Sequence, residues 1–101
     1  MIRIFECRAP LAGADGEALI ATLQAQMPRV THLHPQLLGV TLEVSEGFLI
    51  MTLRVRARDR SNVWQKARLI ASRLLNRVKL DAATATLILV GIPADGRSIK
   101  A

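Results

Sequence analysis

Residues 48–58 place the tightest constraint on the fold, because apolar and polar side chains alternate along them. The apolar positions are Leu49, Met51, Leu53 and Val55, and the polar positions are Thr52, Arg54, Arg56 and Arg58. Successive side chains of a β-strand point to opposite faces of its sheet. The alternation therefore predicts a strand with one face in a core and one face open, which needs neighbouring strands and a covering layer.

A covering helix is predicted directly downstream, at residues 61–79, where Ser61 or Asn62 is expected to cap it. At about 100° per residue, the apolar side chains of this segment fall on a single broad stripe. The stripe contains Val63, Trp64, Ala67, Ile70, Ala71, Leu74, Leu75 and Val78. Basic side chains flank it, with Lys66, Arg73 and Arg77 on one side and Arg68 and Lys79 on the other.

The first part of the chain predicts a strand followed by a second helix. Residues 1–8 have the pattern of the strand, and after a turn-rich connection Asp15 can cap a helix that runs to about Met27. Pro28 is expected to stop this helix, because proline has no N–H to donate to the helical ladder. Residues 29–35 are then expected to be irregular or to form a short extended segment.

Two more strands complete the pattern. The first covers residues 37–44, and residues 45–47 predict a hairpin to the alternating strand, with Gly47 at a positive φ. The last strand covers residues 84–92, and a polar tail follows from about residue 94.

The order strand, helix, strand, strand, helix, strand predicts an α+β fold of the ferredoxin-like βαββαβ kind. Two right-handed crossovers joined by a hairpin give a four-stranded antiparallel sheet in the order 4-1-3-2, with both helices on one face. We expect a single domain spanning residues 1–101. The topology resembles that of RNA-recognition-motif domains, but that family stacks bases on sheet aromatics, and residues 50–58 contain none. No residue role is therefore carried over.

The open face of this sheet is predicted to be basic. If Ile2 and Ile4 point toward the helices, the open face carries Arg3, Phe5, Thr41, Glu43, Thr52, Arg54, Arg56 and Arg58. Its four arginines form the candidate polyanion-binding site, since guanidinium groups bind phosphates in planar, bidentate pairs. The alternative is an ordinary solvated face that keeps the protein soluble by its charge.

The last strand is predicted to be apolar on both faces, with Leu87 and Leu89 on one side and Ile88 and Val90 on the other. A strand of this kind is normally covered on both faces. We expect the cover to be the C-terminal tail or a second subunit. The self-association candidates are Phe5, Ile88, Val90 and Ile92.

Composition narrows the classes of function. Fourteen Lys and Arg residues, most of them Arg, against eight acids give a net charge of +6, which favours an acidic partner. Cys7 is the one cysteine, so an intrachain disulfide and the class of disulfide-stapled secreted scaffolds are excluded. The first residues lack the apolar segment of a signal peptide, and no apolar run is long enough to span a bilayer. We expect a cytoplasmic protein without a membrane partner.

No pattern in the chain indicates an enzyme, a metal site or a cofactor. His32 and His34 lack a third ligand at metal-site spacing, and no histidine constellation surrounds Cys7. Acylphosphatases share this length and element order, but residues 8–13 lack their Gly-rich phosphate loop. The predicted function is a small non-enzymatic interaction domain that forms a homodimer and binds another protein. The alternative is a nucleic-acid-binding module that uses the arginine-rich sheet face.

Overall fold

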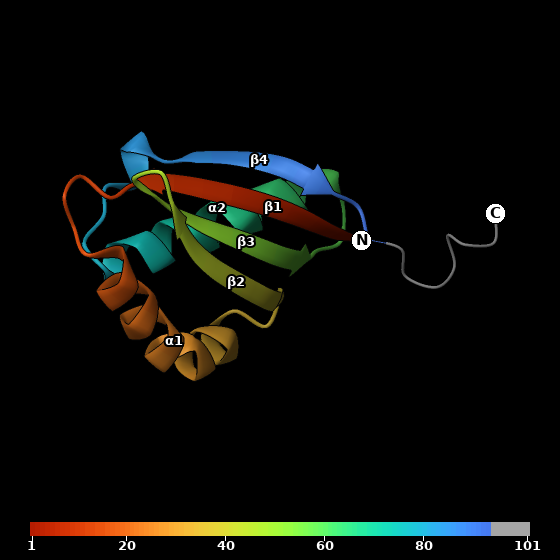
Figure 1. Ribbon diagram of the computed structural model, residues 1–101. Helices are drawn as coiled ribbons and strands as arrows, with labels where there is room; N and C mark the ends of the chain where they lie inside the picture. Colours follow the sequence, from red (N-terminus) through yellow and green to blue (C-terminus); the bar gives the residue numbers. More distant parts are fainter. Residues whose placement is uncertain (94–101) are drawn as a thin grey trace.

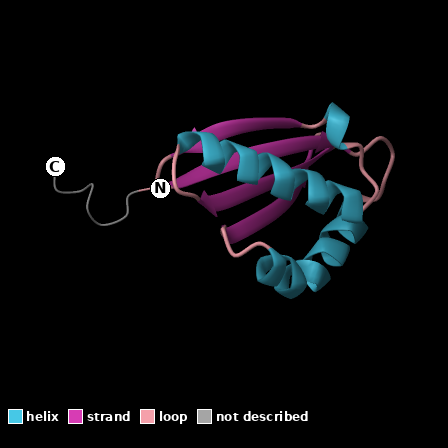
Figure 2. Cartoon of the chain, turned by 180° about the vertical axis from the view of Figure 1, so that it is seen from behind, coloured by secondary structure: helices cyan, strands magenta, loops and turns pink. Residues whose placement is uncertain are grey.

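The structure, a computed structural model of the chain, describes residues 1–93, so the predicted polar tail lies outside the described residues. The elements are β1 (Ile2–Pro10), α1 (Gly16–Leu33), β2 (Leu37–Ser45), β3 (Phe48–Arg56), α2 (Arg60–Arg77), a short 3-10 helix η1 (Ala82–Thr84) and β4 (Thr86–Gly91). The four strands form one antiparallel sheet in the order β2-β3-β1-β4 (Figure 1). Both helices lie over one face of the sheet (Figure 2). The predicted ferredoxin-like α+β sandwich and its strand order are confirmed.

The core lies between the sheet and the two helices, as the sequence pattern predicts. The four apolar positions of β3 are fully buried: Leu49, Met51, Leu53 and Val55. The stripe of α2 meets them from the other layer, and all of its members are buried except Trp64, which is half-buried. Removal of this apolar surface from water is the main source of the fold's stability.

The hairpin between β2 and β3 is a two-residue turn, because Ser45 pairs with Phe48. The two residues between them both have a positive φ, 50° at Glu46 and 83° at Gly47. Two-residue turns of this kind match the right-handed twist of the strands they join. The predicted hairpin and the positive φ of Gly47 are therefore confirmed.

The predicted orientation of the first strand is wrong. Phe5, Cys7 and Ala9 point into the core, and the Phe5 ring packs edge-on against Trp64 with ring centroids 4.8 Å apart. The opposite parity would have buried the charged side chains of Glu6 and Arg8, which is more costly than exposing two isoleucines. Phe5 and Arg3 therefore leave the predicted open face.

Three predicted boundaries also differ from the structure. Pro28 does not stop α1, which continues to Leu33 because Val30, in the added turn, is buried against the core. The N-cap of α2 is Asp59 rather than Ser61 or Asn62, since the Asp59 carboxylate accepts a hydrogen bond from the Asn62 backbone N–H at 2.9 Å. The α2 helix consequently begins earlier than predicted.

Arg58 was predicted to belong to the third strand, but β3 ends at Arg56, so Arg58 lies in the connection that leads into α2. The last strand is also shorter than predicted, because residues 82–84 form η1, whose N-cap is Asp81. The predicted cap of α1 is confirmed, with the Asp15 carboxylate accepting from the backbone N–H groups of Glu17 and Ala18.

Candidate interaction surfaces

The outer edge of β4 is the most exposed apolar region among residues 1–93. β4 pairs with β1 on one side, and no other strand of residues 1–93 pairs with it on the other (Figure 1). The exposed fractions are 50% for Ile88, 41% for Leu89, 47% for Val90 and 64% for Ile92, just beyond the strand. No charged residue occurs from position 82 to position 93. Within the part of the chain that the structure describes, this edge therefore has neither the charges nor the cover that usually protect an edge strand.

The other edge of the sheet, β2, is protected in several ways. Its pairing with β3 is irregular between Leu37 and Gly39, which bends the edge. Glu43 is exposed on it, and α1 packs against it so closely that a Cβ on Gly16 would meet Val44 Cγ2 at 2.5 Å. The contrast with β2 shows that the unprotected state of β4 is particular to that edge.

The four arginines predicted to bind polyanions do not all lie on the open face of the sheet. Arg54 and Arg56 are exposed on the open face of the sheet, where their partners on β1 are Ile4 and Ile2. Arg3 is on the helix side, where it lines a hollow beside Trp64. Arg58 is exposed in the connection after β3. Two of the four predicted residues thus share the predicted face.

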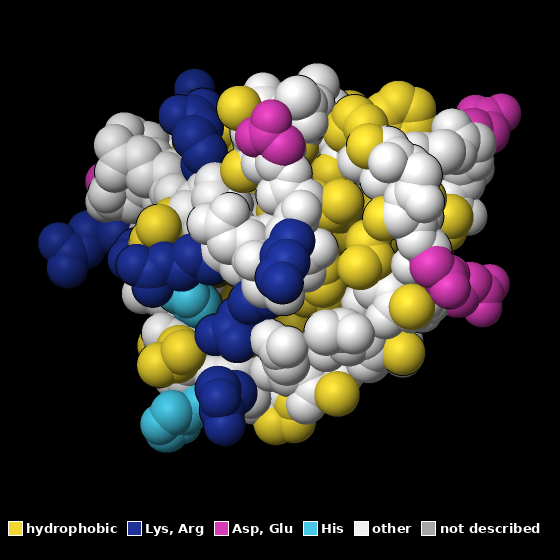
Figure 3. All heavy atoms as spheres, turned by 90° about the vertical axis from the view of Figure 1, so that its left-hand side faces the viewer, with side chains coloured by type: hydrophobic (Ala, Val, Ile, Leu, Met, Phe, Trp, Pro, Cys, Tyr) yellow, Lys and Arg dark blue, Asp and Glu magenta, His cyan; other side chains and the backbone are white. Residues whose placement is uncertain are grey.

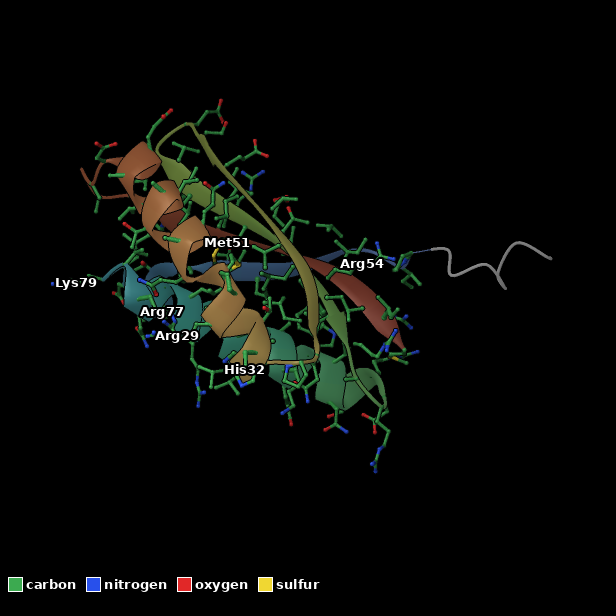
Figure 4. The ribbon with its side chains drawn as sticks, turned by 90° about the horizontal axis from the view of Figure 1, so that it is seen from below. Arg29, His32, Met51, Arg54, Arg77 and Lys79 are labelled. Atoms are coloured by element: carbon green, nitrogen blue, oxygen red, sulfur yellow. The ribbon has the colours of Figure 1, made fainter. Side chains whose placement is uncertain are left out.

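A different group of basic side chains gathers over the helices. Arg29 of α1 and Lys66, Arg73 and Arg77 of α2 form this group, which we name the helix-layer cluster. Figure 3 shows Lys and Arg side chains around the histidines on this side of the molecule, with most carboxylates elsewhere. Figure 4 shows Arg29 and His32 of α1 on the same side as Arg77 of α2. The α1–α2 contact is fixed in part by Arg77, whose Nη1 donates to Gln26 Oε1 at 2.8 Å.

His34 lies within the helix-layer cluster. It is the C-cap residue of α1, its backbone N–H donates to the Val30 carbonyl at 2.9 Å, and 8% of its surface is exposed. Burial lowers the pKa of its imidazole, and the positive charges of Arg73, Lys66 and Arg77 lower that pKa further. The charges that act on His34 are thus all positive.

Sequence reasoning identified the row of Lys66, Arg73 and Arg77 only as a flank of the α2 stripe. It missed Arg29 and His34 as neighbours of that row, because the predicted helix ended at Pro28. The signal that could have extended the helix is the spacing of Leu23, Met27 and Val30, which places three apolar side chains on one helical face. Together, these five charged or titratable residues make a surface that neither helix forms alone.

The remaining candidate residues give no site. His32 is exposed on α1 while His34 is buried at its end, and residues 1–93 contain no group of three or more side chains that could hold a metal ion. Cys7 is 2% exposed, and burial raises the pKa of its thiol to about 11, so the thiol stays protonated at neutral pH. A small cavity of about 240 Å³ beside Cys7 is lined mostly by small and aliphatic side chains.

Comparisons with known proteins add no family assignment. The chain matches no protein-family model, and a search of curated proteins returned no match. Within residues 1–93, no helix combines the length and the apolar character needed to cross a membrane. The function of the chain is therefore inferred from its own surfaces.

The buried imidazole of His34 leads to a pH prediction. The unfolded chain takes up a proton at His34 near the ordinary pKa of about 6.5, whereas the folded chain does so only at lower pH. Between these two pKa values the unfolded state thus binds more protons than the folded state. The contribution of His34 to the free energy of unfolding is therefore full above about pH 6.5 and falls as the pH drops below about 6.5. Denaturant unfolding at about pH 7.5 and about pH 5.5 should show this loss. The loss of stability between the two pH values should be smaller in His34→Gln and unchanged in His32→Gln. An unchanged loss in His34→Gln would contradict the assignment of this pH dependence to His34.

Proposed function

We propose that this protein is a small interaction domain that associates with a second copy of itself through β4. The observation that carries the proposal is the unpaired edge of β4, with Ile88, Leu89 and Val90 each about half exposed. Main-chain N–H and C=O groups on such an edge are a template for another strand. Aliphatic side chains on both faces of that strand give the added contact an apolar component.

A pair of β4 strands running antiparallel about a two-fold axis satisfies these requirements. Each copy then offers the same surface to the other, which is the commonest arrangement of homodimers. The two sheets join into one, and Ile88 of each copy comes close to the same strand of its partner. Addition of a strand from a different protein would use the same edge and the same chemistry.

A binding role fits the described residues better than a catalytic one. The thiol of Cys7 is buried and protonated, and among residues 1–93 no cluster of histidine, cysteine and carboxylate side chains is present. The alternative of a nucleic-acid site on the sheet face has less support, since Arg3 lies on the helix side and Arg58 lies in the connection after β3, outside the sheet. We therefore place the primary contact at β4.

The test is the solution mass of the full chain and of Ile88→Lys. We expect the wild type to sediment at twice the 11.1 kDa of one chain in the micromolar range, and Ile88→Lys to sediment as one chain. A lysine on an edge strand opposes pairing with another strand. Leu38→Lys is the matched control, because Leu38 lies on the protected edge strand β2 and is 40% exposed. It should keep the wild-type mass.

A wild-type mass of 11.1 kDa throughout the micromolar range would overturn the proposal. Equal loss of association in both lysine variants would also contradict it, because the effect would then follow the added charge rather than the strand. Circular dichroism and thermal unfolding of each variant verify that the fold is retained.

A further inference from the structure

The helix-layer cluster carries a positive charge that the described residues do not balance. Arg29, Lys66 and Arg73 form no hydrogen bond or ion pair with a carboxylate in residues 1–93, and helix α2 contains no acid. The salt bridge found in residues 1–93 joins Arg8 and Glu6, on the sheet. Like charges held close together repel one another, so an anion that binds beside such a cluster lowers its electrostatic energy.

The cations of α2 form a row rather than a pocket. Arg73 follows Lys66 by seven positions and Arg77 follows by four more, which is about two turns and then one, so all three lie on one side of the helix. At about 1.5 Å per residue, the row is about 16 Å long. Arg29 widens it from α1, on the same side as Arg77 (Figure 4).

We propose that the helix-layer cluster binds the phosphate backbone of double-stranded nucleic acid. A duplex carries one negative charge per about 1.7 Å of its axis, so a stretch of duplex as long as the row carries about nine phosphates around its circumference, and those on the facing side lie within reach. A single phosphate or a small phosphorylated metabolite would occupy a fraction of this length. Three of the four cations are arginines, whose planar guanidinium groups pair with phosphate oxygens in a bidentate way.

The surroundings of the cluster favour a duplex over a single strand. Single-strand binding without sequence preference uses aromatic side chains on which bases stack. The three aromatic residues of this chain lie elsewhere, since Phe5 and Trp64 pack together under the sheet and Phe48 begins β3. Backbone contacts alone position a duplex without reading its sequence. We therefore expect similar affinity for different duplex sequences.

The test compares two triple variants that remove the same charge from different faces. Arg29→Gln/Lys66→Gln/Arg73→Gln alters the helix-layer cluster and keeps the Arg77 hydrogen bond to Gln26. Arg8→Gln/Arg54→Gln/Arg68→Gln, the matched control variant, removes three exposed arginines, two from the sheet face and one from the side of α2 opposite the row. Binding of the full chain to labelled DNA and RNA duplexes, to single-stranded DNA, to polyglutamate and to anionic phospholipid vesicles is measured from about 50 to about 200 mM salt.

We expect the helix-layer variant to bind duplexes at least about a hundredfold more weakly than wild type at low salt. The slope of log affinity against log salt concentration should be smaller by about three for this variant. The control variant should stay within about threefold of wild type. The DNA and RNA arms show which duplex is preferred. The expected result includes weaker binding to single strands, polyglutamate and vesicles than to duplexes.

Four results would overturn the inference. These are no duplex binding by wild type at low salt, equal losses in both triple variants, a larger loss in the control variant, and binding to polyglutamate or vesicles as tight as to a duplex. The inference is independent of association through β4, because the helix-layer cluster lies on α1 and α2. The sedimentation of the helix-layer variant, measured separately, shows whether its self-association is unchanged. Circular dichroism of both variants verifies that the helices and the sheet are intact.

Discussion

Replacing Phe5 with alanine is expected to lower the free energy of unfolding by about 3–5 kcal/mol, which is the usual cost of removing a fully buried phenylalanine. Phe5 is 0% exposed, and its ring contacts Trp64 edge-on, so both apolar burial and an aromatic contact are lost. Its partners across the sheet are Leu53 on β3 and Leu89 on β4. The cavity would therefore open at the centre of the core.

Ile4→Ala is the matched control for Phe5→Ala. Ile4 is half-buried on the open face, opposite Arg54, so its truncation should cost about 1 kcal/mol. Equilibrium urea unfolding of the two variants and of wild type measures both values. If Ile4→Ala proved the more destabilising of the two, the strand would have the opposite orientation, and Phe5 would return to the open face.

The orientation of β1 shows where sequence reasoning failed and why. Apolar side chains occur at both parities of this strand, so the positions of Ile2 and Ile4 are by themselves ambiguous. The charged residues decide the parity, because Glu6 and Arg8 follow the two isoleucines on the same face. Burying two charges costs more than exposing two aliphatic side chains. Weighing the polar positions as well as the apolar ones would have predicted the observed orientation.

The strand order and the core of β3 could be predicted because their signals are local and consistent. The alternation along β3 identifies its buried face, and the two-residue turn at Gly47 pairs β2 with β3. Two right-handed crossovers then give the order of the four strands. The apolar character of β4 could be predicted in the same way, and its exposure in the structure agrees with that pattern. What covers β4 is not determined by residues 1–93.

The helix-layer cluster could be predicted only in part, because it depends on how two helices pack. Periodicity placed Lys66, Arg73 and Arg77 on one flank of α2. The position of Arg29 depends on the continuation of α1 beyond Pro28, where tertiary packing outweighs local propensity. That conflict between propensity and packing can be measured directly at the proline.

Replacing Pro28 with alanine is expected to stabilise the protein by about 2 kcal/mol. Pro28 lies in the interior of α1 and is exposed, so alanine removes no buried contact there. An interior proline costs a helix about 3 kcal/mol relative to alanine, since it lacks the N–H and crowds the preceding turn. The greater freedom of the unfolded chain offsets about 0.4–1 kcal/mol of that gain. The midpoint of thermal unfolding should rise by about 8 °C or more.

Pro35→Ala is the matched control, because Pro35 is exposed in the connection between α1 and β2 and lies outside any helix. There the substitution only frees the unfolded chain, so stability should fall by up to about 1 kcal/mol. If the helix continues to Leu33, the free energy of unfolding should rise in Pro28→Ala and fall in Pro35→Ala. Loss of stability in both would instead indicate a chain that leaves the helical conformation at Pro28. Arg29 and His34 would then no longer be held beside the basic row of α2, and the helix-layer cluster would be incomplete.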